Sequence, residues 1–457
     1  MDKKKRSNFT GKLGYVLSAA GASVGLGNIW RFPYLAAKYG GAIFLIIYIL
    51  LAVTFGYTMI IAETALGRMT KKSPVGAFEH FGHGWQFSLG GWLNAVIPIL
   101  IVPYYSVIGG WVLRYLIGYF QPNGAATLAS DGFFSSFISS GAGVELWFVV
   151  FSLVNLVVIY LGVQNGIERV SKFMMPILVV LSVIIAIYSM TRPGALEGIK
   201  YFFVPNFSNF SWMTVVTAMG QMFYSLSIAM GILVTFGSYM KKEVSIEEST
   251  EQVEIFDTAI AVMAGLMIIP AVFAFSGAEA AQNLKAGPSL MFITMPKIFA
   301  SMGMGTVIGI LFFVLVLFAA LTSAIALTES AVSTFEDQLH WSRHKSAMIM
   351  GVIMITLGTL SALGYGPLAA VTVIGMQFLD FFDFLTNSVM MPLAAMALCL
   401  LVVRVIGIDK IAEEVKLGGK KFTRKPVFDF MIKYLCPFFV AIILFSSVAS
   451  VLGLISM

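Results

Sequence analysis

Long apolar stretches with few charged residues constrain this chain more than any other feature. A transmembrane helix needs about 20 predominantly apolar residues to cross the hydrocarbon core of a bilayer, and eleven stretches meet or approach that length. They are numbered here as spans 1 to 11 and lie near residues 12–37, 40–68, 90–120, 146–164, 173–191, 213–240, 255–276, 305–335, 346–363, 369–402 and 431–456. The sequence therefore predicts an all-α integral membrane protein with about eleven transmembrane helices.

The composition excludes most other classes of protein. A chain of 457 residues would ordinarily form about three soluble domains, but only 11% of its residues are charged and 58% are hydrophobic. Soluble proteins carry about 25% charged residues, so we expect most of the surface of this protein to face the lipid bilayer. We expect no nucleic-acid partner. Cys399 and Cys436 both lie in apolar stretches, which argues against a disulfide framework or a zinc site built from cysteines.

The distribution of Lys and Arg predicts how the spans are oriented. With a cytoplasmic N-terminus, 21 of these residues lie in segments on the cytoplasmic side and only 5 in segments on the opposite side. This asymmetry follows the positive-inside rule. Because the number of spans is odd, we expect the C-terminus outside. Span 1 continues into Asn28 and Arg31 without a plausible cleavage site, so we expect it to stay in the membrane.

Span 1 contains a run of residues that disfavours a continuous helix. Gly21, Gly25 and Gly27 lie within seven residues and are followed by Asn28 and Arg31. Each glycine costs a helix about 1 kcal/mol relative to alanine, so the backbone is predicted to unwind here. Carbonyl groups freed in this way cannot face lipid and must line a cavity or bind an ion. The alternative is a glycine seam that lets two helices pack closely.

Span 6 contains a second candidate break, with Ser225, Ser227 and Gly231 inside an apolar run. Spans 1 and 6 begin the two halves of a five-plus-five inverted repeat. Interrupted helices at corresponding positions of two halves indicate a midplane substrate site in a secondary transporter, and two breaks in register favour this interpretation over a packing seam. We expect one transporter domain over 1–457, divided into 1–200 (spans 1–5), 201–403 (spans 6–10) and 404–457, a cytoplasmic surface helix with span 11.

Span 8 carries two adjacent hydroxyl side chains, Thr322 and Ser323. Such hydroxyls in a membrane helix commonly donate to the carbonyl four residues earlier, which is one interpretation of this pair. Beside unwound carbonyl groups they become oxygen ligands of the kind that a hard cation such as Na+ prefers. The sequence leaves both interpretations open.

Several motifs together resemble one known family. They are Gly-Leu-Gly-Asn-Ile-Trp-Arg-Phe-Pro at 25–33, Glu-Thr-Ala-Leu-Gly-Arg at 63–68, Tyr104-Tyr105, the break in span 6 and Leu-Thr-Ser at 321–323. This pattern resembles the neurotransmitter:sodium symporter family, in its bacterial amino-acid transporter branch. The resemblance implies a sodium-coupled symporter that imports an amino acid by alternating access across the cell (inner) membrane, and not an enzyme.

The resemblance also implies two sodium sites. The ligands of the first would be the Ser23 carbonyl, Asn28, Ser225 and Asp257, with the carboxylate of the substrate as a further ligand. The ligands of the second would be carbonyls of Gly21, Val24 and Ala319 and hydroxyls of Thr322 and Ser323.

The ligand from span 7 is the least certain in register, since counting from either end of the span differs by one residue. We choose Asp257 because it is the only ionisable residue between Glu254 and Glu279, and intramembrane charges are functional by default. A permanent carboxylate here would replace the chloride ion used by animal relatives, so no chloride requirement is expected. The alternative is that Asp257 caps or snorkels at the inner end of span 7.

The substrate pocket is implied by the same resemblance. Gly25 stands where amine transporters of the family carry Asp, so the substrate is expected to bring its own carboxylate. The residues expected to line the pocket are Ala22, Ser23, Leu26, Gly27, Ile101, Tyr105, Tyr224, Ser225, Ser227, Met230, Ser323 and Leu327. Because methionine adapts to varied shapes, Met230 favours neutral, hydrophobic or aromatic L-amino acids. Ala229 replaces a more usual glycine and is expected to crowd the pocket floor. The alternative for these Met and aromatic residues is that they belong to the hydrophobic core, where such residues are more common.

Two gates are expected on either side of the pocket. On the outside, Arg31 is expected to pair with Asp383 through Gln221, with Asp380 as the rival partner. Exposed ion pairs contribute only about 0 to 1 kcal/mol, which suits latches that open easily.

On the inside, Arg6 and Asp337 are expected to close the cytoplasmic path, with Phe9 packed near Tyr239.

Three alternatives compete with this interpretation. A gated cation channel would need a continuous pore. A membrane enzyme would need a catalytic constellation, but the four His residues fall in predicted cytoplasmic loops without a metal-binding spacing. A proton-coupled amino-acid carrier of similar fold would typically carry Lys where Thr322 and Ser323 lie. The sequence does not determine the oligomeric state.

Overall fold

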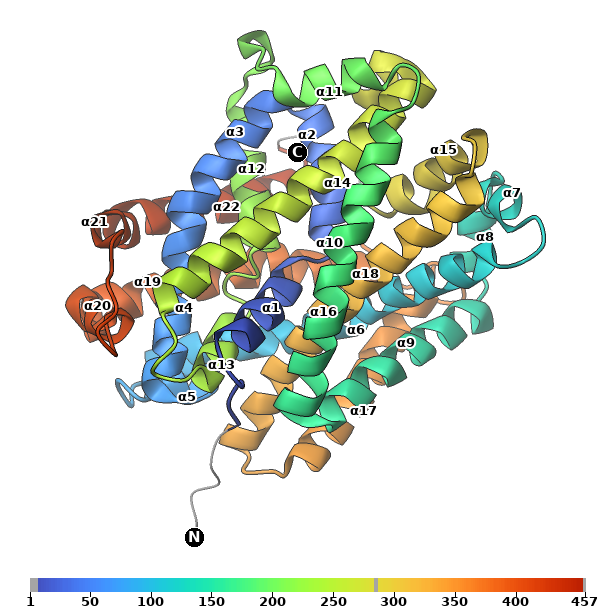
Figure 1. Cartoon of the computed structure of the whole chain (residues 1–457). Coiled ribbons are helices and arrows are strands. Elements are labelled where there is room, and N and C mark those ends of the chain that lie inside the picture. The colour runs from blue at the N-terminus through green and yellow to red at the C-terminus, as the bar shows by residue number, and fades with distance from the viewer. Residues whose placement is uncertain (1–6, 283–286, 455–457) are drawn as a thin grey trace.

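The computed structural model describes residues 7–282 and 287–454 and is a bundle of helices (Figure 1). Within those residues, nine helices are long and apolar enough to cross a membrane. They are Ala42–Thr70, Trp85–Tyr119, Ala142–Tyr160, Val163–Met190, Ile246–Gly277, Gly305–Gln338, Arg343–Leu363, Phe378–Ile406 and Lys425–Val451. These correspond to predicted spans 2 to 5 and 7 to 11, and the two remaining spans are present as broken helices.

Span 1 consists of α1 (Lys12–Ser23), a π-helical turn η1 (Gly27–Arg31) and α2 (Phe32–Lys38). Span 6 consists of α12 (Trp212–Ser225) and α13 (Ile232–Tyr239). Together with the nine continuous helices they give the eleven spans that the sequence predicts. The two interruptions also confirm the predicted breaks at the start of each half.

The backbone in the break of span 6 has φ angles that are incompatible with a right-handed helix. Ser227, Ala229 and Gly231 have φ angles of 54°, 60° and 70°, in the left-handed region. Glycine adopts this region freely, whereas a residue with a Cβ atom is strained there by about 1 to 2 kcal/mol. Two non-glycine residues in this conformation therefore indicate that surrounding contacts hold the segment open.

The other described elements complete these spans and their connections. They are α3 (Ala42–Leu51), η2 (Ala52–Gly56), α4 (Tyr57–Thr70), α5 (Pro74–Glu79), α6 (Trp85–Tyr119), α7 (Gly124–Ala129), α8 (Phe133–Ile138), α9 (Ala142–Tyr160), η3 (Val163–Glu168), α10 (Arg169–Met190), α11 (Ala195–Phe203), η4 (Phe207–Asn209), α14 (Ile246–Gln282), η5 (Leu290–Thr294), α15 (Met295–Ser301), α16 (Gly305–Gln338), α17 (Arg343–Leu363), α18 (Phe378–Asp383), η6 (Phe384–Met390), α19 (Met391–Leu400), η7 (Leu401–Ile406), α20 (Ile408–Val415), α21 (Lys425–Phe430), η8 (Met431–Leu435) and α22 (Cys436–Val451).

The spans differ in how far they lie from the centre of the bundle. In the most apolar window of α6, 78% of residues are buried, against 17% for Lys425–Val451. The helix α6 packs along α16, and α1 packs against α14 and α16. Span 1 and its break are therefore enclosed by the central helices, whereas span 11 lies at the periphery.

The start of span 10 differs from the prediction. The predicted span begins at residue 369, but the helix begins at Phe378, after a turn region that contains the Val373–Met376 bridge. Ile374 and Gly375 have φ angles of 53° and 76°. Consecutive residues in the left-handed region cannot continue a helix. The apolar character of residues 369–374 concealed this turn.

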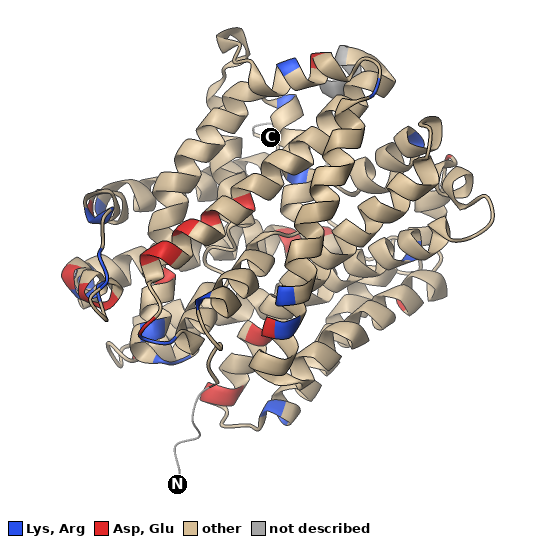
Figure 2. Cartoon of the chain, in the orientation of Figure 1, with Lys and Arg blue, Asp and Glu red and all other residues tan. Residues whose placement is uncertain are grey.

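The predicted surface helix after span 10 is α20, and its apolar side faces the protein. Ile411, Ala412 and Val415 are buried where α20 packs against α4. Figure 2 shows Lys and Arg gathered at the end of the bundle that carries the N-terminus, α5 and α20. The C-terminus lies toward the other end in the same view.

Candidate functional site

A small cavity lies between the two helix breaks. It has a volume of about 30 Å³ and is bounded by span 1, α6, the break of span 6 and α16. Its lining contains all twelve residues of the predicted substrate pocket, together with Gly25 and Asn28. A volume of about 30 Å³ is far below the roughly 300 to 1,000 Å³ of ligand pockets. The pocket is therefore contracted in this conformation.

Gly25 allows the break of span 1 to approach its neighbours. A Cβ atom at Gly25 would lie 2.8 Å from the Ser323 hydroxyl and 3.1 Å from the Tyr105 hydroxyl. The Tyr105 hydroxyl in turn accepts a hydrogen bond from the Leu26 amide at 3.3 Å. A side chain at position 25 would therefore force the Ser323 or Tyr105 hydroxyl to move.

Four residues meet at the predicted first sodium site. The Asn28 Nδ2 donates to Asp257 Oδ1 at 2.8 Å, and the Ser225 hydroxyl donates to the same carboxylate at 3.0 Å. The Tyr48 hydroxyl donates to Asp257 Oδ2 at 2.9 Å. All four side chains are buried, so they form a polar cluster that joins the two breaks to span 7. Ser23 contributes to the wall of the small cavity nearby.

The predicted second sodium site is a cluster of neutral oxygens between span 1 and α16. The Ser323 hydroxyl lies within hydrogen-bonding reach of three carbonyls, those of Gly21, Ala22 and Val24, at 3.2, 3.1 and 3.5 Å, and its one hydrogen can be donated among them. The Thr322 hydroxyl donates to its own helix, at the carbonyls of Phe318 and Ala319.

The donor set in both clusters suits a small hard cation. Within the described residues, no group of three or more His, Cys, Asp and Glu side chains lies close enough to hold a metal ion. Carbonyls, hydroxyls, one amide and one carboxylate are the oxygen ligands that such a cation prefers. Glycine at position 21 lets span 1 approach α16 closely, because a Cβ atom there would lie only 3.2 Å from Thr322 Cβ.

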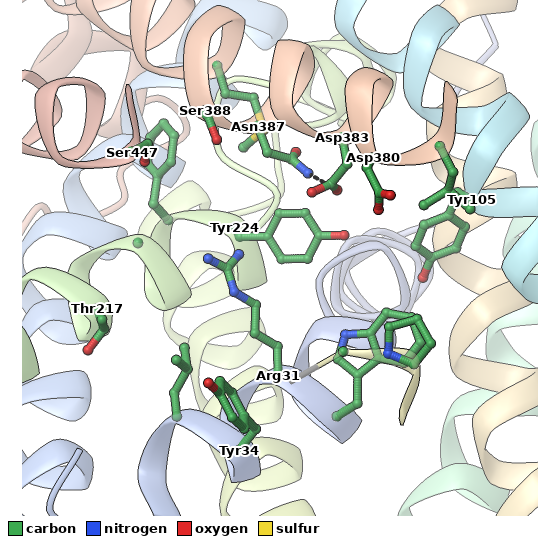
Figure 3. Close-up of a pocket in the computed structure, with 18 of the residues that line it drawn as sticks. Arg31, Tyr34, Tyr105, Thr217, Tyr224, Asp380, Asp383, Asn387, Ser388 and Ser447 are labelled. Carbon is green, nitrogen blue, oxygen red and sulfur yellow. Dashed lines mark hydrogen bonds between the residues drawn. The ribbon is translucent and has the colours of Figure 1, made fainter. Parts of the chain in front are cut away.

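A larger cavity of about 430 Å³ lies beside the small one, at the residues of the predicted outer gate. Tyr105 and Tyr224 line both cavities, so their rings form the partition between them. The Arg31 guanidinium carbon lies 5.4 Å from the centre of the Tyr224 ring. Figure 3 shows the Tyr224 ring between Arg31 and Asp383. The ring separates the two charges that the sequence predicts to pair.

The outer gate therefore differs from the prediction in its contacts. In the part of the chain that the structure describes, no ion pair within 4 Å joins Arg31 to Asp383 or Asp380. Asp383 accepts hydrogen bonds from the Tyr104 hydroxyl at 3.2 Å and from Asn387 Nδ2 at 2.6 Å.

Gln221 does not bridge the outer gate either. Its Nε2 donates to the Gly27 carbonyl at 3.1 Å, across the two breaks. Asp380, the rival partner of Arg31, accepts from the Tyr365 hydroxyl at 3.0 Å. Local hydroxyl and amide partners thus satisfy both carboxylates while the tyrosine ring occupies the space in which the ion pair was expected.

Aromatic side chains pack together at the predicted inner gate. The Phe9 ring lies 6.0 Å from the Tyr239 ring, edge to face, and the Phe9 amide donates to the Tyr239 carbonyl at 3.1 Å. Asp337 Oδ2 accepts from the Ser73 amide at 2.5 Å. The predicted partner of Asp337, Arg6, lies outside the described residues.

Two residues at the site were given no role by the sequence. Glu63 is fully buried, and its carboxylate accepts from the Ala229 amide at 2.7 Å, which fixes the strained segment of span 6. A buried acid in an apolar run was a usable signal for Glu63. Tyr48, which donates to Asp257, is a neutral aromatic residue in an apolar stretch and gave no such signal.

A family model described as the sodium:neurotransmitter symporter family matches residues 6–133 and 133–454. The chain belongs to this family. It is 32% identical over 448 residues to the uncharacterized sodium-dependent transporter YhdH of Bacillus subtilis, covering 97% of this chain and 98% of the relative. It is 30% identical over 438 residues to a sodium-dependent transporter of Methanocaldococcus jannaschii, covering 92% and 87% of the two chains.

A solved structure extends the similarity to the fold. The crystal structure of MhsT in complex with L-phenylalanine matches with a TM-score of 0.86 and 35% identity, covering 97% of this chain and 100% of MhsT. A more distant family member, the human sodium- and chloride-dependent GABA transporter 2, is 27% identical over 468 residues, covering 92% of this chain and 74% of the relative. The all-α transporter fold expected from the sequence is confirmed.

Proposed function

We propose that this chain imports neutral, hydrophobic or aromatic L-amino acids together with Na+ by alternating access. It would lie in the cell (inner) membrane with its N-terminus cytoplasmic and its C-terminus outside. The observation that carries the proposal is the small cavity between the two helix breaks, because every predicted pocket residue lies on its wall. Discontinuous helices around a midplane cavity are the arrangement by which secondary transporters bind substrate and coupling ion together.

The substrate would be oriented by its two charged groups. Its carboxylate would meet Na+, the Gly27 amide and the Tyr105 hydroxyl, and its ammonium group would meet carbonyls at Ala22 and near Ser227. The Ser227 hydroxyl already donates to the Ala22 carbonyl at 3.1 Å, so these groups converge. The positive ends of the half-helices favour a carboxylate in the same place. Apolar side chains on the remaining wall, and the L-phenylalanine bound to MhsT, support a hydrophobic or aromatic substrate.

Two sodium ions would bind beside the substrate. The first would be held by the Ser23 carbonyl, Asn28, Ser225 and Asp257, and would also contact the substrate carboxylate. The buried Asp257 carboxylate supplies the negative charge there, which supports transport without chloride.

The second sodium ion would be held between span 1 and α16 by Gly21, Val24, Ala319, Thr322 and Ser323. The Ser323 hydroxyl already contacts the Gly21 and Val24 carbonyls. Loss of this ion would free the inner half of span 1, α1, from α16. In the proposed cycle, the release of this second sodium ion opens the path to the cytoplasm.

Access from the outside would be controlled by Tyr105 and Tyr224. Both rings separate the outer cavity from the contracted pocket, so their displacement would join the two spaces. A cation over an aromatic ring contributes about 0.5 to 1 kcal/mol at an exposed site. The Arg31–Tyr224 contact is therefore a weak latch, suited to a gate that opens in every transport cycle.

Uptake into proteoliposomes tests the proposal. A panel of labelled amino acids is offered with Na+ replaced by K+ and, separately, with chloride replaced by gluconate. We expect uptake of neutral hydrophobic or aromatic L-amino acids that requires Na+ and persists in gluconate. Uptake that persists without Na+ and follows a proton gradient would support the proton-coupled carrier instead, and a Na+ conductance without substrate accumulation would support a channel.

A further inference from the structure

An ion pair between a buried carboxylate and a partly exposed arginine lies behind the proposed first sodium site, one helical turn from Asp257. Glu254 on α14 is 4% exposed, and its Oε2 lies 3.6 Å from Arg424 Nη1. Arg424 belongs to the connector between spans 10 and 11, defined here as residues 407–424. Arg424, which is more than 150 positions from Glu254 along the chain, thus places its positive charge against span 7.

The backbone of the connector is fixed to span 7 at this point. Glu247, which is 5% exposed, accepts hydrogen bonds from the Thr423 and Arg424 amides, both at 2.8 Å. The Tyr57 hydroxyl donates to the same carboxylate at 2.9 Å. Three donors on one buried carboxylate hold residues 423 and 424 in a single position.

The Arg424 side chain is held as firmly as its backbone. Its guanidinium carbon lies 4.0 Å from the centre of the Tyr57 ring, and its Nη2 donates to the Val53 carbonyl at 3.0 Å. Val53 lies in η2, a π-helical turn, where the wider spacing leaves carbonyls available to other donors. The guanidinium is therefore pre-organised against span 2 with one edge directed at Glu254.

Glu254 and Asp257 are three residues apart on α14 and share one face of that helix. Both are buried, and Glu254 Oε1 has no hydrogen-bond partner among the residues that the structure describes. Two further carboxylates lie near Arg424. Glu247 accepts from its backbone amide, and the partly exposed Glu251 lies 3.9 Å from its Nη1. Arg424 is therefore the cation that compensates Glu254, and Glu254 is the buried charge nearest in sequence to Asp257.

We propose that Arg424 and Glu254 form a charge pair that sets the Na+ affinity of the first sodium site without touching the ion. This inference rests on the proposed function, in which Asp257 binds Na+. Arg424 is a positioning residue in this account, since it acts through Glu254. The connector between spans 10 and 11 is thereby electrostatically linked to the ion site.

The two partners have opposite expected effects. Replacing Glu254 by Gln removes the most buried carboxylate that faces the guanidinium, so the net charge behind Asp257 becomes more positive and repels Na+. Replacing Arg424 by Gln leaves a second buried carboxylate, and its negative charge attracts Na+. One unit charge acting over roughly 10 Å at an effective dielectric constant of 20 to 40 changes an ion affinity by about four- to fifteenfold.

The experiment measures the Na+ concentration that gives half-maximal binding of labelled L-phenylalanine, at constant ionic strength with choline as the replacement ion. Glu254→Gln should raise this concentration by about fourfold or more, and Arg424→Gln should lower it by a similar factor. The double variant should return to within about twofold of the wild type, since the two charges cancel. Arg424→Lys, which keeps the charge, should also stay near the wild type.

A matched control is the exposed pair of Lys200 and Glu197, whose atoms lie 3.0 Å apart. Glu197→Gln and Lys200→Gln should leave the Na+ dependence unchanged, because exposed charges are screened.

Shifts in the same direction for both single variants would mean that the pair only supports the structure, and unchanged values would mean that it does not influence the site. Either result overturns the inference. If Glu254→Gln does not yield folded protein, Arg424→Gln tests the inference by itself. An unchanged or raised Na+ concentration for half-maximal binding in Arg424→Gln would then contradict the inference. Absence of Na+-dependent binding in the wild type would instead contradict the proposed function.

Discussion

The Asn28 amide donates a 2.8 Å hydrogen bond to Oδ1 of Asp257, a residue 229 positions further along the chain. This contact joins the break of span 1 to span 7. It brings the buried carboxylate to the neutral oxygens that the broken helices release. The proposed coupling of Na+ to substrate depends on this arrangement, and the following predictions test its parts.

Replacing Asp257 by Asn removes the negative charge at the proposed first sodium site. We expect the Na+ concentration for half-maximal uptake to rise by about tenfold or more, or uptake to become dependent on chloride, because an anion would then supply the missing charge. Na+ titrations of uptake with and without chloride measure both effects. Asp131→Asn, at an exposed position in the turn between α7 and α8, is the control. A titration identical to that of the wild type would remove Asp257 from the site.

Replacing Thr322 by Ala removes a hydroxyl from the proposed second sodium site. We expect uptake to fall by about tenfold or more while part of the L-phenylalanine binding remains, because the substrate contacts the first ion and not the second. Thr356→Ala is the control: its hydroxyl donates to the Val352 carbonyl four residues earlier, as Thr322 does to Phe318, but it lies on an exposed face. Equal losses in the two variants would show that Thr322 serves only its own helix.

Replacing Gly25 by Ala places a Cβ atom 2.8 Å from the Ser323 hydroxyl in a pocket that is already contracted. Overpacking of this kind costs about 1 to 3 kcal/mol, so we expect L-phenylalanine binding to weaken by about tenfold. Equilibrium binding measures the change. The control is Gly11→Ala, since nothing lies within 4 Å of a Cβ atom at Gly11. Wild-type affinity in Gly25→Ala would argue against a substrate beside this segment.

Replacing Ala229 by Gly relieves the left-handed conformation at φ 60°. We expect the protein to become about 1 kcal/mol more stable, because glycine adopts this conformation without the Cβ penalty. The opposite change at Gly231, whose φ is 70°, places a Cβ atom 2.8 Å from the Asn94 carbonyl and should destabilise the protein. Thermal unfolding in detergent measures both. A less stable Ala229→Gly variant would contradict the strain at this position.

The sequence predicts the features that depend on local composition. The glycines of span 1 indicate where its helix breaks, and a lone acid in span 7 indicates Asp257, because both signals arise within a few residues. The boundary of span 10 is wrong because apolar side chains say little about backbone direction, and Ile374 adopts a left-handed conformation inside an apolar run.

Contacts between distant segments are the part that the sequence does not predict. The pairing of Arg31 with Asp383 rests on opposite charge alone, whereas the Tyr224 ring lies between the two residues. Nothing in the sequence around Tyr48 or Arg424 indicates a role at the site. The packing of span 2 against span 7 brings Tyr48 to Asp257, and the packing of the connector brings Arg424 to Glu254. Such placements depend on tertiary packing, for which a single sequence gives no direct signal.

An experimental structure determined in Na+ and L-phenylalanine tests the central claim most directly. The account predicts the amino acid in the pocket between the two breaks, one cation bonded to Asn28 and Asp257, and a second beside Ser323 and Thr322. Spans 1 and 6 that run as continuous helices, or an amino acid bound without a cation at either cluster, would contradict it.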